Sequence, residues 1–141
     1  MVIAEDVRRK LEAARVARLA TVSPEGTPHV IPVCFVFDGS VIYSAIDRKP
    51  KRTPLLQLAR LTNIKTTPEV ALLVDEYNDD WEQLWYVLVR GKAELVTAEG
   101  EHDLAVARLR AKYPQYAAGM LDADAPVLRI TPERITSWGR L

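Results

Sequence analysis

Charged side chains of opposite sign follow each other along the middle of the chain. Six cations and no acid lie between positions 48 and 65, and five acids and no cation lie between positions 75 and 82. The cations are Arg48, Lys49, Lys51, Arg52, Arg60 and Lys65. Lys49, Lys51 and Arg52 stand just past a predicted strand and just before a predicted helix, where a phosphate would receive charge-assisted hydrogen bonds. The pattern predicts either an anion site or a basic surface loop that faces an acidic one.

Aromatic residues form the second candidate group. Trp81, Trp85 and Tyr86 lie close together in the sequence, and Trp138 stands beside a glycine in a Ser-Trp-Gly segment. Ordinary packing accounts for such residues, but a tryptophan next to a glycine also suits the rim of a groove in which a planar ring binds. A phosphate clamp together with aromatic walls is what a flavin-like cofactor requires.

The sequence offers few side chains for acid–base, nucleophilic or metal chemistry. His29 begins a predicted strand without a visible acidic partner, and His102 lies in a polar helix. Cys34 is the only cysteine, and we expect it to pack as a small hydrophobe. Zinc-site spacing and the GxSxG, HExxH, Walker and GxGxxG motifs are absent. We therefore expect no catalytic side chain and no metal, and in an enzyme a cofactor would carry the chemistry.

Composition narrows the class of protein further. The chain has 141 residues, of which 48% are apolar and 27% charged, so we expect one globular domain over residues 1–141. Nineteen Lys and Arg balance nineteen Asp and Glu, which argues against nucleic acid or an anionic membrane as a partner. No apolar run approaches the ~18 residues of a membrane span, and the N-terminus lacks the apolar core of a signal peptide. A cytoplasmic location is expected.

Short strands separated by turns predominate among the predicted elements. Helices are expected over 4–15, near 54–61 and over 98–112, and strands over 16–22, 29–37, 41–46, 70–76, 84–96, 127–130 and 134–138. Asp38-Gly39 predicts a hairpin turn, Gly91 a bend in a long strand, and Pro32 a bulge or an edge position. Segment 29–37 is apolar on both faces, which predicts cover from both sides by a barrel or a partner subunit. The order of elements predicts a mainly β protein, an antiparallel barrel with flanking helices.

Several segments resemble the pyridoxamine 5'-phosphate oxidase-like split barrels. The most specific is ATVSPEGTPHV at 20–30, and KPKR at 49–52, VRGKAEL at 89–95 and RITSWG at 134–139 add to it. NDDW at 78–81 and LWY at 84–86 make the chain most similar to the short members that use the deazaflavin coenzyme F-420. The resemblance implies a six-stranded antiparallel split β-barrel of the FMN-binding type. It also implies a homodimer with a cofactor groove between the subunits.

The resemblance assigns cofactor-binding roles to eleven positions. It places Pro32 and Val33 on the strand that faces the ring system, and it places Tyr43, Ser44 and Ala45 at a strand end along the cofactor. Lys49, Lys51 and Arg52 match the positions that hold the phosphate. Trp85 and Tyr86 fall on the strand that faces the partner subunit, and Trp138 matches the C-terminal aromatic residue at the groove.

The function that the resemblance implies is that of an oxidoreductase. We expect an F-420-dependent reductase that transfers a hydride from the reduced deazaflavin to an unidentified small molecule. An FMN-dependent oxidoreductase and a non-catalytic binder of flavin, deazaflavin or haem remain open. Only Arg140 follows Trp138 as a cation, so the Arg/His set with which the oxidases bind their substrate phosphate is not expected. The additional cations Arg48, Arg60 and Lys65 suit the carboxylate tail of F-420 and favour F-420 over FMN.

Overall fold

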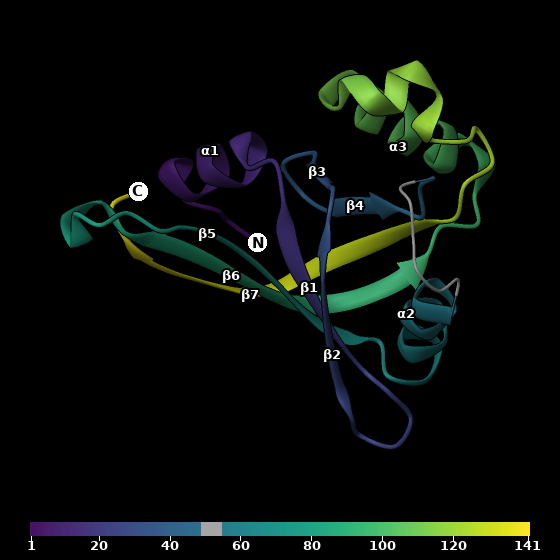
Figure 1. The fold of residues 1–141 in the computed structure, drawn as a ribbon, viewed down its shortest axis with the longest axis horizontal. Coiled ribbons are helices and arrows are strands. Elements are labelled where there is room, and N and C mark those ends of the chain that lie inside the picture. The colour runs from purple at the N-terminus through teal and green to yellow at the C-terminus, as the bar shows by residue number, and fades with distance from the viewer. Residues whose placement is uncertain (49–54) are drawn as a thin grey trace.

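One curled antiparallel sheet makes up most of the protein. The computed structural model describes residues 1–48 and 55–141. Its seven strands are β1 (Ala17–Val22), β2 (Pro28–Val33), β3 (Val36–Phe37), β4 (Ile42–Ala45), β5 (Glu69–Glu76), β6 (Trp85–Leu95) and β7 (Val127–Gly139). They lie in the order β2-β1-β5-β6-β7-β4-β3, and β1 and β2 cross the long strands in Figure 1. The curled sheet confirms the predicted split-barrel fold class.

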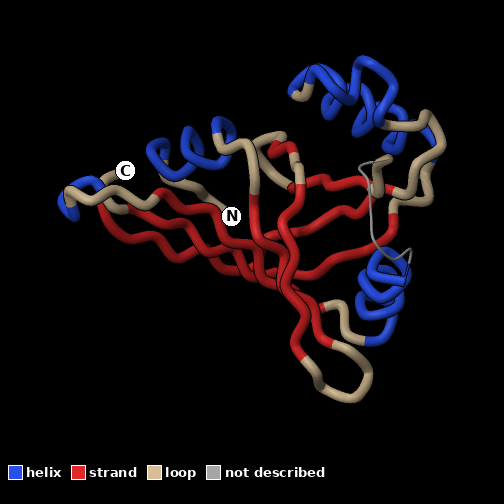
Figure 2. The backbone as a smooth tube through the Cα atoms, viewed as in Figure 1, coloured by secondary structure: helices blue, strands red, loops and turns tan. Residues whose placement is uncertain are grey.

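Three helices pack against this sheet. They are α1 (Glu5–Ala13), α2 (Leu55–Thr66) and α3 (Glu99–Lys112), with a short 3₁₀ turn η1 (Trp81–Gln83) and a π turn η2 (Tyr116–Met120). Figure 2 shows α3 and the turn after it at the end of the sheet opposite the β5–β6 connection. The two ends of the sheet are called the α3 end and the β5–β6 end, after the elements that lie there. No described helix is long and apolar enough to cross a membrane.

Two hydrophobic clusters hold the layers together. The larger one lies between the sheet and α1 and includes the fully buried side chains of Leu11, Leu19 and Phe35. The smaller one joins α3 to β4 and the start of β7 through side chains such as Leu109 and Val127. Burying a side chain of this size contributes about 2 kcal/mol relative to leaving it exposed. The α3 end thus has a core of its own.

The predicted strand over 29–37 is interrupted, which corrects the sequence-based boundary. The backbone N–H of Phe35 donates to the hydroxyl of Tyr113 at 3.0 Å, so this residue leaves the ladder between β2 and β3. The Phe35 side chain packs in the larger cluster and Cys34 packs against the smaller one, so the predicted cover from both sides holds at the break. It does not hold along β2, where Val30 and Pro32 are exposed. β2 itself lies at the edge of the sheet, as Pro32 indicates, and Val30 on it is 60% exposed.

The two strands predicted over 127–130 and 134–138 are one strand, β7, which is a second correction. Gly91 of β6 lies opposite Pro132 while Arg90 lies opposite Arg134, so Glu133 is the extra residue of a bulge. The bulge accommodates a proline, which has no N–H for the ladder. A Cβ on Gly91 would lie 2.1 Å from the carbonyl oxygen of Thr131, so this position requires glycine. The predicted irregularity at Gly91 is confirmed.

The Asp38-Gly39 hairpin forms as predicted. Asp38 Oδ1 accepts hydrogen bonds from the backbone N–H groups of Ser40 and Val41, both at 2.8 Å. This turn joins β3 to β4, and β3 accounts for the difference between the seven described strands and the six that the resemblance implies.

Candidate functional site

An exposed aromatic pair lies at the β5–β6 end of the sheet. Tyr86 on β6 is directly opposite Trp138 on β7. The two rings are stacked, with centroids 6.0 Å apart and an angle of 23° between their planes. Trp138 is 53% exposed. This pair therefore presents a flat aromatic surface to the outside of the chain, because an indole in a core would be covered.

Trp85 points to the opposite face of β6, as strand alternation requires. Its side chain is buried, and Nε1 donates to Oε2 of Glu76 at 2.9 Å. The ammonium of Lys10 on α1 lies 4.6 Å from the ring centroid. Within one chain Trp85 thus belongs to the core, while Tyr86 beside it belongs to the exposed pair.

The predicted strand-end residues Tyr43, Ser44 and Ala45 lie on β4, and all three are buried. Ser44 Oγ donates to the carbonyl oxygen of Cys34 at 2.8 Å. The hydroxyl of Tyr43 donates to Oε2 of Glu101 on α3 at 2.8 Å. Burial, and then the hydrogen bond to the Glu101 carboxylate, raise the pKa of Tyr43 to about 12. Tyr43 is therefore a neutral phenol that joins β4 to α3.

Arg129 completes this polar contact between α3 and the sheet. Its Nη1 donates to both carboxylate oxygens of Glu101, and Nη2 lies 3.2 Å from Oε2 of Glu94. The hydrogen bond from Arg129, followed by that from Tyr43, holds the pKa of Glu101 below its usual range. Glu101 is consequently ionised at neutral pH, and its carboxylate links α3 to the sheet.

Pro32 and Val33 lie at the end of the edge strand β2. Pro32 is exposed, whereas Val33 is buried in the larger cluster. Val33 pairs with Ala17 of β1. The exposed apolar surface of this strand is therefore formed by Pro32 and its neighbour Val30.

The structure keeps the predicted residues of β4 apart from the aromatic pair. Tyr43 is opposite Arg129 on β7, whereas Tyr86 is opposite Trp138 on the same strand. Nine residues of extended strand at about 3.3 Å each separate these positions by about 30 Å along β7. A fused three-ring system is far shorter than this. One chain thus brings Tyr86 and Trp138 together, and brings Tyr43, Ser44 and Ala45 together, but keeps the two groups apart.

The phosphate-binding candidates Lys49, Lys51 and Arg52 lie outside the described residues. Three other cations of the basic stretch are described: Arg48, Arg60 and Lys65, and Lys65 is exposed near the end of α2. Arg48 is largely exposed, and its Nε lies 2.9 Å from Oδ1 of Asp122. Arg60 on α2 is buried, and burial lowers its pKa while the carboxylate of Asp47 opposes that shift.

Sequence inspection alone missed the buried polar residues around Arg60. Tyr116 donates to Oδ2 of Asp47, and both side chains are buried. These residues are far apart along the chain, and neither stands in a recognisable motif. A buried acid directly after a strand was the only available signal.

Cys34 and the two histidines lie apart from the aromatic pair. Cys34 packs against the smaller cluster, and His102 Nε2 lies 2.6 Å from the carbonyl oxygen of Ala125. His29 is partly buried, and its Nδ1 has no hydrogen-bond partner among the described residues. Within the described part of the chain, no three His, Cys, Asp or Glu residues gather in a way that could hold a metal ion.

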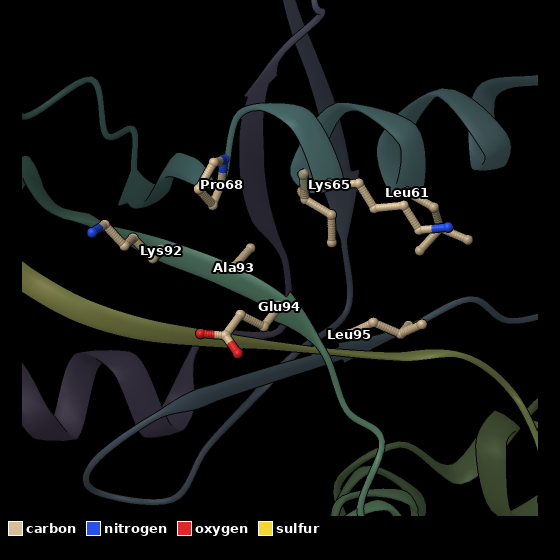
Figure 3. A pocket seen from close by; sticks show the side chains of 8 residues that line it. Leu61, Lys65, Pro68, Lys92, Ala93, Glu94 and Leu95 are labelled. Atoms are coloured by element: carbon tan, nitrogen blue, oxygen red, sulfur yellow. The ribbon is translucent and has the colours of Figure 1, made fainter.

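A cavity of about 430 Å³ lies between α2 and the second half of β6. Figure 3 shows Leu61 and Lys65 on its helix side and Lys92 and Leu95 on its strand side. Its lining is mainly apolar, and Lys65 is the one residue of it that was predicted to contact the cofactor, through the F-420 tail. The cavity is therefore separate from both groups of predicted cofactor residues.

The chain is similar in sequence to a known protein family and to a reductase. The family model for pyridoxamine 5'-phosphate oxidase matches residues 3–139. A 5a,11a-dehydrotetracycline/5a,11a-dehydrooxytetracycline reductase from Streptomyces rimosus is 29% identical over 133 residues, which are 92% of this chain and 78% of that protein.

Solved structures agree in fold. A conserved hypothetical protein from Mycobacterium tuberculosis superposes with a TM-score of 0.76 at 23% identity, covering 99% of this chain and 86% of that one. A FAD-binding protein from Mesorhizobium loti gives a TM-score of 0.70 at 23% identity, with 96% and 94% covered. At these identities the two likenesses show the fold alone.

Proposed function

Since the chain belongs to the pyridoxamine 5'-phosphate oxidase family, we propose that it is an F-420-dependent oxidoreductase that reduces a small molecule. The relative from Streptomyces rimosus, described as a reductase and aligned with 92% of this chain, supports reduction. The fold likeness to a FAD-binding protein supports a flavin-type ring as the cofactor. The observation that carries the proposal is the stacked, half-exposed pair of Tyr86 and Trp138, because a flat aromatic surface fits a planar ring.

The cofactor site is proposed to lie between two copies of the chain. About 30 Å of strand separates Tyr43 from Trp138 within one chain, so a three-ring system that touches both groups would take one group from each copy. A symmetric pair of chains supplies two such grooves. The exposed edge residues Val30 and Pro32 offer apolar surface that a second copy would cover.

Each group of residues then has a distinct role. Tyr86 and Trp138 of one copy would hold the ring system, with Trp85 behind them as the buried support. Pro32, Val33, Tyr43, Ser44 and Ala45 of the other copy would shape the opposite wall, largely through backbone and buried packing. Lys49, Lys51 and Arg52 are proposed from the sequence to hold the phosphate, and Arg48, Arg60 and Lys65 to favour the carboxylate tail of F-420 over FMN.

The protein itself contributes orientation and exclusion of water. When bound, the reduced deazaflavin supplies a hydride from a ring carbon. The titratable side chains Tyr43 and Glu101 near β4 are already engaged, because Tyr43 and Arg129 both donate hydrogen bonds to Glu101. Catalysis would therefore come from fixing two reactants in contact rather than from a reactive side chain.

Titration of the purified protein with F-420 and with FMN, followed by tryptophan fluorescence, tests this proposal. We expect F-420 to bind more tightly than FMN and Trp138→Ala to abolish most of the affinity. Trp81→Ala is the matched control, since Trp81 is also exposed, at 72%, but is not part of the pair. Tight FMN binding without F-420 binding would assign the protein to the flavin alternative. If neither ligand binds below roughly 100 μM (about −5.5 kcal/mol), or if only haem binds, the proposal fails.

A further inference from the structure

The backbone that follows β4 is held by a segment from the other end of the chain. The ladder between β4 and β7 ends at Ala45. Beyond it, the N–H of Ile46 donates to the carbonyl oxygen of Pro126 at 2.9 Å, and the N–H of Arg48 donates to that of Met120 at 3.0 Å. Residues 46–48 are thus fixed by segment 116–126, outside the regular sheet.

Side chains strengthen this connection on both faces of the backbone. The hydroxyl of Tyr116 donates to Oδ2 of Asp47, and both residues are buried. Arg60 on α2 interacts electrostatically with the same Asp47 carboxylate. On the exposed side, Arg48 forms an ion pair with Asp122 at 2.9 Å. Consecutive residues 47 and 48 are therefore both held by side chains of segment 116–126.

The geometry of segment 116–126 depends on a turn at Gly119. Its φ is +112°, a conformation that L side chains rarely adopt. This turn directs the chain back so that the Met120 carbonyl meets the Arg48 N–H. Tyr116 is in turn packed against Tyr113, whose ring centroid is 5.2 Å away. Packing thus sets the position of the phenol, and its hydroxyl is directed at Asp47.

We propose that Tyr116 is a positioning residue of the anion-binding end of the cofactor site, and that it acts through Asp47 on Arg48. This inference rests on the proposed function. Arg48 is the first cation of the basic stretch, and its side chain is 63% exposed. It directly precedes the phosphate candidate Lys49 in the sequence, so here it is assigned a role at the phosphate beside its role toward the F-420 tail. A cation on a fixed backbone loses less conformational freedom when it meets a phosphate than one on a mobile backbone. In this role Tyr116 contacts Asp47 and not the ligand.

The proposal predicts an effect that is confined to the phosphate end of the ligand. Tyr116→Phe keeps the buried ring and removes only the hydroxyl, so the aromatic pair that holds the ring system is unaffected. We expect the dissociation constant for FMN to rise about tenfold, the size of a lost hydrogen bond to a charged group. Riboflavin, which carries the same ring without phosphate, should change less than about twofold. F-420 and its phosphate-free deazaflavin ribityl fragment provide the same comparison.

Tyr113→Phe is the matched control. Tyr113 is a buried tyrosine of the same cluster, but its hydroxyl contacts the backbone of Phe35 and Arg15 rather than Asp47. It should leave the ratio of FMN to riboflavin affinity unchanged. A merely structural role for Tyr116 would instead weaken both ligands by the same factor in Tyr116→Phe.

A second variant covers the case in which Tyr116→Phe does not fold. Gly119→Ala strains the turn at positive φ without meeting any atom within 4 Å, and Gly26→Ala does the same in the β1–β2 turn. Only Gly119→Ala should lower the ratio of FMN to riboflavin affinity, and only it should speed hydrogen exchange at the Ile46 and Arg48 amides. If the wild type binds the cofactor and the folded variants keep its ratio of FMN to riboflavin affinity, this inference alone is overturned. A wild type that binds neither phosphate-bearing cofactor overturns the proposed function as well.

Discussion

Arg129 Nη1 lies 2.6 Å from Oε1 and 2.8 Å from Oε2 of Glu101, so one guanidinium nitrogen on β7 binds both oxygens of a carboxylate on α3. Tyr43 donates to the same carboxylate from β4. The α3 end of the protein is therefore attached to the sheet by a charged contact as well as by the smaller cluster. This contact makes the stability of the protein sensitive to acid.

The first prediction concerns Glu101→Gln. The pKa of Glu101 is lowered in the folded state, chiefly by its hydrogen bond from Arg129. A carboxyl whose folded pKa is lowered contributes stability above its unfolded pKa, about 4.3, and loses it as the pH falls through the folded value. We expect the variant to lose about 1 kcal/mol at pH 7 and to show a shallower decline below pH ~4.3. Urea unfolding between pH 7 and 3 measures this, with Glu99→Gln as the control. Parallel pH profiles for wild type and Glu101→Gln would contradict it.

A second prediction concerns Lys112 and alkaline pH. Its Nζ donates to the carbonyl oxygen of Phe35 at 2.9 Å and lies 4.1 Å from that residue's ring centroid. Burial, and then the charge of Arg15, lower the pKa of Lys112 to about 8. Between this value and the unfolded pKa of about 10.4, the unfolded chain binds the extra proton, so stability rises with pH.

Lys112→Met tests that assignment because it keeps the apolar stem over Phe35. We expect denaturant unfolding to show increasing stability from pH 8 towards pH 10 in the wild type and a flat profile in the variant. The exposed Lys92→Met should retain the wild-type slope. A slope that survives in Lys112→Met would show that another group is responsible.

The bulge between β6 and β7 gives a third prediction. A Cβ at Gly91 would lie 2.1 Å from the Thr131 carbonyl oxygen, which is backbone and cannot turn aside. We expect Gly91→Ala to destabilise the protein by about 3 kcal/mol through overpacking. Gly100→Ala on α3 meets nothing within 4 Å and should be neutral or slightly stabilising, since alanine favours a helix. Thermal unfolding of the two variants measures this difference. Equal melting temperatures would show that position 91 does not require glycine.

The fourth prediction addresses the groove between two copies. Trp138→Ala and the double variant Lys51→Ala/Arg52→Ala should each bind cofactor poorly, for different reasons. If each groove takes Trp138 from one copy and the basic residues from the other, a mixed dimer of the two variants holds one intact groove. Random mixing by co-refolding should then restore about one groove in four, as counted by titration. No recovery in the mixture, or a monomer by light scattering, would exclude a shared groove.

Local signals in the sequence were sufficient for much of the fold. Asp38-Gly39 determines its own turn, and Gly91 marks the bulge because glycine inside an apolar strand indicates a close backbone approach. The break at Phe35 was not predictable, since the group that draws its N–H out of the ladder is the hydroxyl of Tyr113, far away in sequence. The π turn after Pro114 depends in the same way on the contact between Tyr116 and Asp47.

The residues of the candidate site could be predicted from the sequence, but which of them lie next to each other could not. Tyr86 and Trp138 were both identified in the sequence, yet their pairing depends on a register that includes the extra residue Glu133. Tyr43 was identified as well, but its partner Glu101 lies on a helix, and only the tertiary packing of that helix brings the two together. Residue chemistry is local, whereas the distances between residues are set by long-range pairing.

The position of β7 in the sheet has a consequence for how a nascent chain reaches this structure. β7 lies between β6 and β4, so the hairpin of β3 and β4 is linked to the other strands only through β7. During synthesis that hairpin leaves the ribosome before residues 127–139, so the edge of β4 that pairs with β7 is unpaired until then. Such an edge is a template for association with other chains. The protein should therefore be most vulnerable to aggregation, and most dependent on chaperones, in the interval between the synthesis of β4 and that of β7.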